Sequence, residues 1–190
     1  MSQYFGKAVH TAFVVPDIEQ AVNRMLESGI GPAYYMKGIR VPGRYRGERN
    51  DVLITAVFFY SGSLQYEFIQ QHDDTPSAYR EFMERTPEGG LHHVAYFCDN
   101  FAAAIRGAAE AGQMFDIVQE FIGEDGSPYE IYMEPLDSKD PVLVQLMLPG
   151  PLEDCFAEME RTAATWRGEN PIRNALDLLP PEMRPPMEAV

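Results

Sequence analysis

Cysteine and basic residues are both scarce in this sequence of 190 residues. The two cysteines, Cys98 and Cys155, form no Cys-x-x-Cys pair, which argues against a disulfide framework or a cysteine-ligated structural zinc site. The chain has only 15 basic residues but 29 acidic ones, which gives a formal net charge of −14. Such a surface repels nucleic-acid phosphates and anionic lipids, so we expect neither a nucleic-acid nor a membrane partner.

Long hydrophobic runs are also missing. No stretch is long and apolar enough to suggest a membrane span, and the first residues lack the apolar core of a signal peptide. Together with the low cysteine content, this predicts a cytoplasmic protein. Hydrophobic residues still make up 45% of the chain, enough to bury a sizeable core in a domain of ordinary length.

An internal repeat is the strongest pattern present. Residues 10–29, HTAFVVPDIEQAVNRMLESG, align without a gap to residues 93–112, HVAYFCDNFAAAIRGAAEAG, at one offset of 83. Six pairs match in kind: His10 with His93, Ala12 with Ala95, Phe13 with Tyr96, Ile18 with Phe101, Ala21 with Ala104, and Gly29 with Gly112. The repeat predicts a duplicated unit of strand, helix and further strands, neither copy of which could bury its sheet alone.

The repeat also distinguishes the adjacent histidines of GGLHHVAYF. His93 has a counterpart in the first copy, His10, whereas His92 has none. Side chains alternate between the two faces of a strand, so His92 points the other way. We therefore expect His92 to pack between sheet and helix, and His93 to carry any ligand role.

Two further polar residues sit inside apolar strands. Glu67 lies in LQYEFIQ and Gln145 in VLVQLML. A charge in a hydrophobic strand is costly unless it is paired, so these residues could be aimed inward with His10 and His93. Two imidazoles, a carboxylate and an amide suit one divalent ion, either Zn, Fe, Mn, Co or Ni. The alternative is that Glu67 faces solvent on an edge strand and Gln145 is an ordinary amide at the rim of the core.

These residues resemble the vicinal oxygen chelate superfamily, which includes glyoxalase I, methylmalonyl-CoA epimerase, extradiol dioxygenases and bleomycin-resistance proteins. The resemblance spans about residues 8–148, and GGLHHVAYFCDN is most similar to the methylmalonyl-CoA epimerase branch. It implies an α+β fold of two βαβββ modules, residues 8–71 and 91–148, that form one open mixed β-barrel within a domain of residues 1–150. It also places His10, Glu67, His93 and Gln145 on the four metal positions.

One departure from the family concerns the proton-transferring base. Where epimerases and glyoxalases usually have a glutamate that is both ligand and base, this chain has Gln145, which cannot accept a proton at neutral pH. Glu67 is then expected to act as the base from the opposite module. A second base occurs on an early strand of module one in the epimerases, and Asp51 falls near that place.

The resemblance therefore implies a metal-dependent lyase, isomerase or epimerase that acts through an enolate on a small oxygen-rich or apolar substrate. Two alternatives remain: an Fe(II) extradiol-type dioxygenase using His10, His93 and Glu67, and a non-catalytic drug-sequestering protein. Four arginines between Arg40 and Arg49 offer either a local basic patch or a solvated loop. Residues 151–190 are expected to form a helix and an extended proline-rich tail that caps a pocket or a homodimer.

Overall fold

The chain follows the same path twice. The structure is a computed structural model that describes residues 1–139 and 142–190. The first module contains β1 (Ala8–Val14), α1 (Ile18–Glu27), β2 (Ala33–Tyr45), β3 (Glu48–Ser61) and β4 (Leu64–Gln71). After α2 (Ala78–Arg85), the second module contains β5 (Gly90–Phe97), α3 (Phe101–Glu110), β6 (Phe115–Ile122), β7 (Pro128–Pro135) and β8 (Leu143–Met147). The tail contains α4 (Pro151–Ala163), β9 (Ile172–Asn174) and two short 3-10 turns, η1 (Ala175–Leu178) and η2 (Pro181–Met183).

The repeat determines how the two module helices begin and end. Asp17 and Asn100, equivalent positions at the same offset of 83, each cap a helix by accepting a backbone N–H three residues on. Gly29 and Gly112 follow the helix ends with φ of 76° and 84°, a left-handed conformation that glycine adopts without strain. No helix in the described part of the chain is long and apolar enough to span a membrane.

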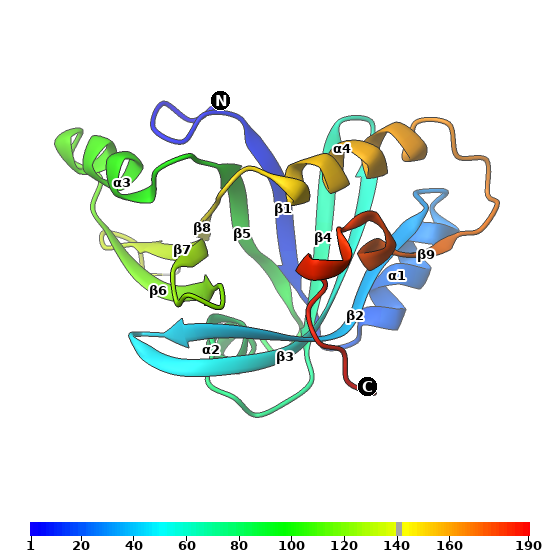
Figure 1. Ribbon diagram of the computed structural model, residues 1–190, viewed down its shortest axis with the longest axis horizontal. Helices are drawn as coiled ribbons and strands as arrows, with labels where there is room; N and C mark the ends of the chain where they lie inside the picture. Colours follow the sequence, from blue (N-terminus) through cyan, green and yellow to red (C-terminus); the bar gives the residue numbers. More distant parts are fainter. Residues whose placement is uncertain (140–141) are drawn as a thin grey trace.

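The strands form one curled sheet in the order β3-β4-β1-β5-β8-β7-β6-β2-β9, and an additional β2–β3 pairing closes it into a ring (Figure 1). Each module contributes four neighbouring strands to this ring. The modules meet at the antiparallel β1–β5 pair and, over only three residue pairs, at β2–β6. The predicted glyoxalase-like barrel of two βαβββ modules is therefore confirmed.

Strand alternation separates an interior from two outer layers. Ile18 and Val22 of α1 pack on the outer face of module one, and Phe101 and Ile105 of α3 pack on that of module two. Inward-facing residues of all eight barrel strands form a single interior cluster, which also contains Tyr79 of α2. The barrel is thus covered by helices outside and filled by side chains inside.

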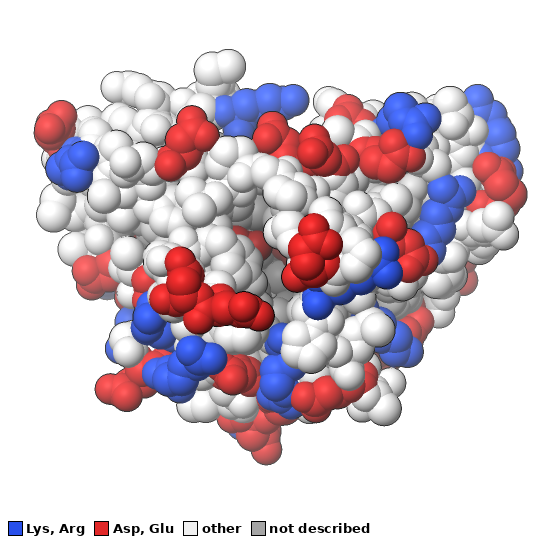
Figure 2. Space-filling view, in the orientation of Figure 1, with Lys and Arg blue, Asp and Glu red and all other residues white. Residues whose placement is uncertain are grey.

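The segment that carries the four arginines forms strands and not the solvated loop that was one of the two expectations. It forms the turn end of a long hairpin in which β2 and β3 pair from Tyr34–Phe58 to Tyr45–Glu48, around a turn at Arg46 and Gly47. Each of the four arginines meets a carboxylate: Arg40 meets Asp73 and Glu188, Arg44 meets Glu120, Arg46 meets Glu81 and Glu134, and Arg49 meets Asp51. Acidic and basic side chains are correspondingly interspersed over this hairpin in Figure 2. A basic patch is therefore not formed.

The tail is part of the barrel's core. Cys155, Phe156 and Met159 of α4 join the interior cluster, as do Ala175 and Leu176 of η1. Between these two elements, β9 pairs with β2 in parallel, and near the end of the chain Glu188 pairs with Arg40. Figure 1 shows α4 crossing the barrel strands near β1 and β4. The predicted tail helix is present as α4, and the proline-rich stretch after it contacts the barrel at β9, at η1 and again at residues 186–188.

Two methionines of the tail test this docking. Met159 is fully buried, whereas Met183 in η2 is 48% exposed. We expect Met159→Ala to lower the free energy of unfolding by about 2–5 kcal/mol, since it leaves a cavity in the core. Met183→Ala, the matched control, should change it by no more than about 0.5 kcal/mol. Urea denaturation measures both, and equal small effects would contradict a tail that completes the core.

Candidate metal centre

Four adjacent strands aim one polar side chain each into the barrel. They are β4, β1, β5 and β8, neighbours in the ring. The side chains are Glu67, His10, His93 and Gln145, and each is at most 7% exposed. On each of these strands, the residue two positions further along the chain, on the same face, belongs to the interior core. The structure thus brings together all four metal ligands predicted from the sequence.

The four side chains converge within a few ångströms. The Oε2 atom of Glu67 lies 3.2 Å from Nε2 of His10 and 3.4 Å from Nε2 of His93. The Oε1 atom of Gln145 lies 3.0 Å from Nε2 of His10. Donor atoms from His10, Glu67 and His93 all fall within 4.8 Å of one another, a grouping able to hold a metal ion.

The proton on His10 is located by a chain of hydrogen bonds. Nδ1 lies 2.9 Å from Oε1 of Gln65, while the amide nitrogen of Gln65 donates to the hydroxyl of Tyr60 at 2.8 Å. The Gln65 oxygen can only accept, so Nδ1 of His10 carries a hydrogen and donates it. Neutral His10 therefore presents the lone pair of Nε2 to Glu67 and Gln145.

A second chain performs the same function for His93. Nε2 of His92 lies 3.3 Å from the carbonyl of Ala78, which can only accept, so His92 donates from that nitrogen. Burial, followed by the neighbouring His93, holds the pKa of His92 well below its usual value, so His92 is neutral and its Nδ1 accepts. Nδ1 of His93, 2.9 Å away, must then donate. This leaves Nε2 of His93 as a lone pair.

His92 thus lies where the sequence predicts, against a helix and away from the four converging groups. Its ring packs against Tyr79 and Phe82 of α2. Its hydrogen bond to His93 is an additional role that the sequence pattern did not reveal. Metal-binding histidines commonly donate their second nitrogen to such a partner, which fixes the ring.

The acceptor atoms that meet at the centre favour a positive charge between them, either a proton on Nε2 of His10 or a metal ion. Among the described residues, Oε2 of Glu67 and Nε2 of His93 are buried without a hydrogen-bond partner. Ligands bonded at about 2.0–2.2 Å to one ion are separated by roughly 3.0–3.5 Å, which matches the observed spacings of 3.0, 3.2 and 3.4 Å. The residues present therefore fit a divalent ion held by His10, Glu67, His93 and Gln145.

Charge effects couple Glu67 to the two imidazoles. Burial alone would raise the pKa of Glu67, but the two imidazoles outweigh it and lower that pKa to about 2. For His10, burial lowers the pKa and the neighbouring Glu67 raises it, with a net rise. Glu67 is thus a carboxylate at neutral pH and the negatively charged member of the set.

Glu130 on β7 is a second carboxylate at the centre, and the sequence analysis missed it. Its Oε2 accepts a hydrogen bond of 2.9 Å from the Gln145 amide nitrogen, which also donates to the Tyr132 hydroxyl. These two acceptors turn the Gln145 oxygen toward His10. Burial, followed by repulsion from Glu67, raises the pKa of Glu130 to about 7. The pattern that singled out Glu67, a carboxylate within an apolar strand, also applies to Glu130. However, Glu134 lies on the same face of YEIYME, so that face could equally have been one exposed to solvent.

Asp51, the predicted second base, is not brought to the centre. In β3, Val52 and Phe58 belong to the interior cluster, so alternation places Asp51 on the outer face. Its carboxylate pairs with Arg49 at 2.9 Å. The inward position is occupied instead by its neighbour Asn50, whose amide donates to the Pro76 carbonyl. Asp51 therefore does not contribute to the centre.

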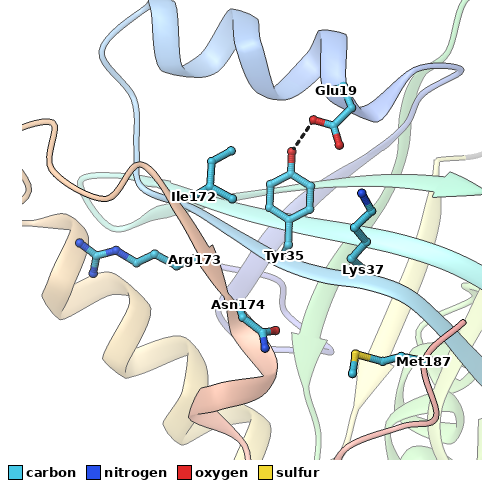
Figure 3. Close-up of a pocket in the computed structure, with 7 residues that line it drawn as sticks. All are labelled: Glu19, Tyr35, Lys37, Ile172, Arg173, Asn174 and Met187. Carbon is cyan, nitrogen blue, oxygen red and sulfur yellow. Dashed lines mark hydrogen bonds between the residues drawn. The ribbon is translucent and has the colours of Figure 1, made fainter. Parts of the chain in front are cut away.

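A separate hollow opens on the outer face of β2. It has a volume of about 370 Å³ and lies between α1, β2 and the tail. Figure 3 shows Tyr35 at its floor, hydrogen-bonded to Glu19, with Lys37 beside it and Met187 at the far side. Tyr35 packs with the outer cluster of α1, whereas its neighbour Tyr34 faces the interior. This hollow is therefore separated from the metal centre by the sheet.

Known proteins match this chain in sequence and in fold. The family model described as the glyoxalase/bleomycin resistance protein/dioxygenase superfamily matches residues 9–141. An ethylmalonyl-CoA/methylmalonyl-CoA epimerase of Cereibacter sphaeroides is 26% identical over 134 residues, covering 70% of this chain and 90% of that protein. The crystal structure of methylmalonyl-CoA epimerase from Mycobacterium tuberculosis is similar with a TM-score of 0.53 at 17% identity, covering 80% of this chain and 94% of that one. A selenomethionine methylmalonyl-CoA epimerase gives 0.51 at 19% identity, covering 79% and 100%. At these identities the structural matches establish the fold alone.

The two adjacent histidines provide a direct test of the centre. We expect His93→Ala to abolish binding of one divalent ion per chain, because it removes a ligand. His92→Ala should only weaken binding, by roughly 10–100-fold, the usual effect of losing a residue that orients a ligand. Equilibrium dialysis with Co²⁺ or Zn²⁺ measures both affinities. Stronger loss in His92→Ala than in His93→Ala would contradict the assignment.

Proposed function

Because the chain belongs to the glyoxalase/bleomycin resistance protein/dioxygenase superfamily, we propose that it is a metal-dependent isomerase of the epimerase type. It moves a proton at a carbon next to a carbonyl group of a small substrate, through an enolate. The observation that carries this proposal is the convergence of two buried imidazole nitrogens, Nε2 of His10 and Nε2 of His93, on the carboxylate of Glu67.

The ion, when bound, would supply a Lewis acid that stabilises negative charge developing on substrate oxygens. Two histidines, one carboxylate and one neutral amide leave a centre with net positive charge, which suits that purpose. The ligand set contains no thiolate, and this favours a catalytic site over a closed structural zinc site.

Two carboxylates of the centre are available to carry the proton. Glu67 is supplied by module one and Glu130 by module two, so they approach the site from different strands, β4 and β7. Glu67 is held as a ligand between two imidazoles, while Glu130 touches the site only through the amide of Gln145. We propose that Glu130 is the main proton carrier, and that Glu67 contributes chiefly as a ligand.

The substrate class follows from the relative of known activity. An epimerase of ethylmalonyl-CoA and methylmalonyl-CoA suggests a branched malonyl thioester. The net charge of −14 and the pairing of all four hairpin arginines with carboxylates make a poor surface for the polyanionic nucleotide of coenzyme A. We therefore propose that recognition centres on the acyl part of the substrate.

Solvent deuterium exchange tests the reaction. Metal-loaded protein is incubated in D₂O with methylmalonyl-CoA and, in parallel, with the methylmalonyl thioester of N-acetylcysteamine, which lacks the nucleotide. Mass spectrometry should detect deuterium at the carbon next to the thioester in at least the truncated substrate. Absence of exchange in both substrates, with the metal bound, would contradict the proposal.

An Fe(II) extradiol-type dioxygenase is the second candidate, because His10, His93 and Glu67 form a two-histidine, one-carboxylate group. Under that function, Gln145 is a bystander and the Fe(II)-loaded protein consumes oxygen with a catechol. Oxygen uptake without deuterium exchange would favour it over the isomerase.

Neutralising Glu130 and neutralising Glu67 should have different effects. Glu130→Gln should keep the metal and lose proton exchange by roughly 10²–10⁴-fold, the usual contribution of a general base. Glu67→Gln should also retain an ion, since an amide oxygen still coordinates, but with lower affinity. Metal content and deuterium exchange are measured on the same preparations. Undiminished exchange in Glu130→Gln would move the base back to Glu67, where the sequence first placed it.

A further inference from the structure

Helix α4 contacts the metal centre although it lies outside the segment matched by the family model, which ends at residue 141. The ring of Phe156 lies 5.9 Å from that of His10 and 5.2 Å from that of Phe58, measured between centroids. Phe156 is only 4% exposed. The helix therefore forms an apolar wall directly beside one of the metal ligands.

The same residue is joined to His10 by hydrogen bonds. The Tyr60 hydroxyl donates to the backbone carbonyl of Phe156 at 3.0 Å. It also accepts from the Gln65 amide nitrogen at 2.8 Å. Gln65 in turn accepts from Nδ1 of His10 at 2.9 Å. All of these groups are buried. The Phe156 carbonyl at the end of the chain can only accept, so the donor and the acceptor of every bond in the chain are fixed.

The direction of this chain determines the state of His10. With its hydrogen committed to the α4 carbonyl, the Tyr60 oxygen accepts from Gln65 and so fixes which end of the amide faces His10. If the amide turned over, its nitrogen would face Nδ1, and neutral His10 would then favour a hydrogen on Nε2, the atom aimed at Glu67. The orientation of one amide thus decides which ring nitrogen is free to bind a metal.

We propose that Tyr60 is a positioning residue, which uses the Phe156 carbonyl of α4 to hold Gln65, and through it His10, in the state that binds the metal. This inference rests on the proposed metal site. It makes α4 a functional part of the centre, and it assigns the hydroxyl of Tyr60 a role distinct from packing.

Tyr60→Phe removes the hydroxyl and keeps the ring. We expect the dissociation constant for Co²⁺ to rise by roughly 10–100-fold and the visible absorption spectrum of the bound Co²⁺ to change, since the His10 ligand is no longer held. Tyr35→Phe is the matched control, because its buried hydroxyl also donates to a side chain, Glu19, but on the outer face of β2. The control should bind Co²⁺ as the unmodified protein does.

Variants of Gln65 separate positioning from stability. Gln65→Glu keeps an acceptor for Nδ1 of His10 and should retain most of the affinity, whereas Gln65→Leu removes the acceptor and should lose it. Equal affinity of Tyr60→Phe and the unmodified protein, or of the two Gln65 variants, would overturn the inference. If the unmodified protein itself bound no divalent ion, the proposed function would fail instead, so the two failures are distinguishable.

Discussion

Lone pairs that face one another inside an apolar barrel are the constraint on which this site depends. A carboxylate, two imidazoles and an amide oxygen approach to about 3 Å at a place where water cannot separate them. An uncompensated buried charge costs several kcal/mol, so a positive charge beside Glu67, carried by a proton on His10 or by a metal ion, stabilises this arrangement. The same requirement explains why the four strands that carry these groups are neighbours in the ring. The curl of the sheet brings together even residues of strands that are not directly paired, such as Glu67 on β4 and His93 on β5.

Both histidines are oriented in the same way, although the groups that orient them differ. Each donates Nδ1–H into a hydrogen-bond chain that ends at a helix carbonyl. For His93 the chain runs through His92 to Ala78 in α2, and for His10 it runs through Gln65 and Tyr60 to Phe156 in α4. Neither helix belongs to the repeated modules. The duplicated barrel supplies the ligands, and the elements added between and after the modules hold them in the state that binds a metal.

The sequence predicted those parts of the structure that depend on periodicity. An offset of 83 paired His10 with His93, and a charge within an apolar strand singled out Glu67. Asp51 and Glu130 show where this reasoning stops. Whether a carboxylate faces inward depends on the register of long strands. In β3, Asn50 faces inward and its neighbour Asp51 faces outward. The hydrogen-bond chain through Tyr60 could not be predicted either, because it depends on how a helix outside the repeat docks on the barrel. The strands of the segment with four arginines could not be predicted either, because Arg40, Arg44 and Arg46 meet carboxylates distant in the sequence.

The location of a bound ion tests the central claim most directly. Crystals of the protein soaked in Co²⁺ and measured at the cobalt absorption edge give an anomalous-difference map of every site. The account predicts one strong peak per chain, within bonding distance of Nε2 of His10, Nε2 of His93 and a carboxylate oxygen of Glu67, with the Gln145 oxygen as the fourth protein ligand. A map with no peak among these side chains at saturating Co²⁺, or a peak bound by Nδ1 of either histidine, would contradict it.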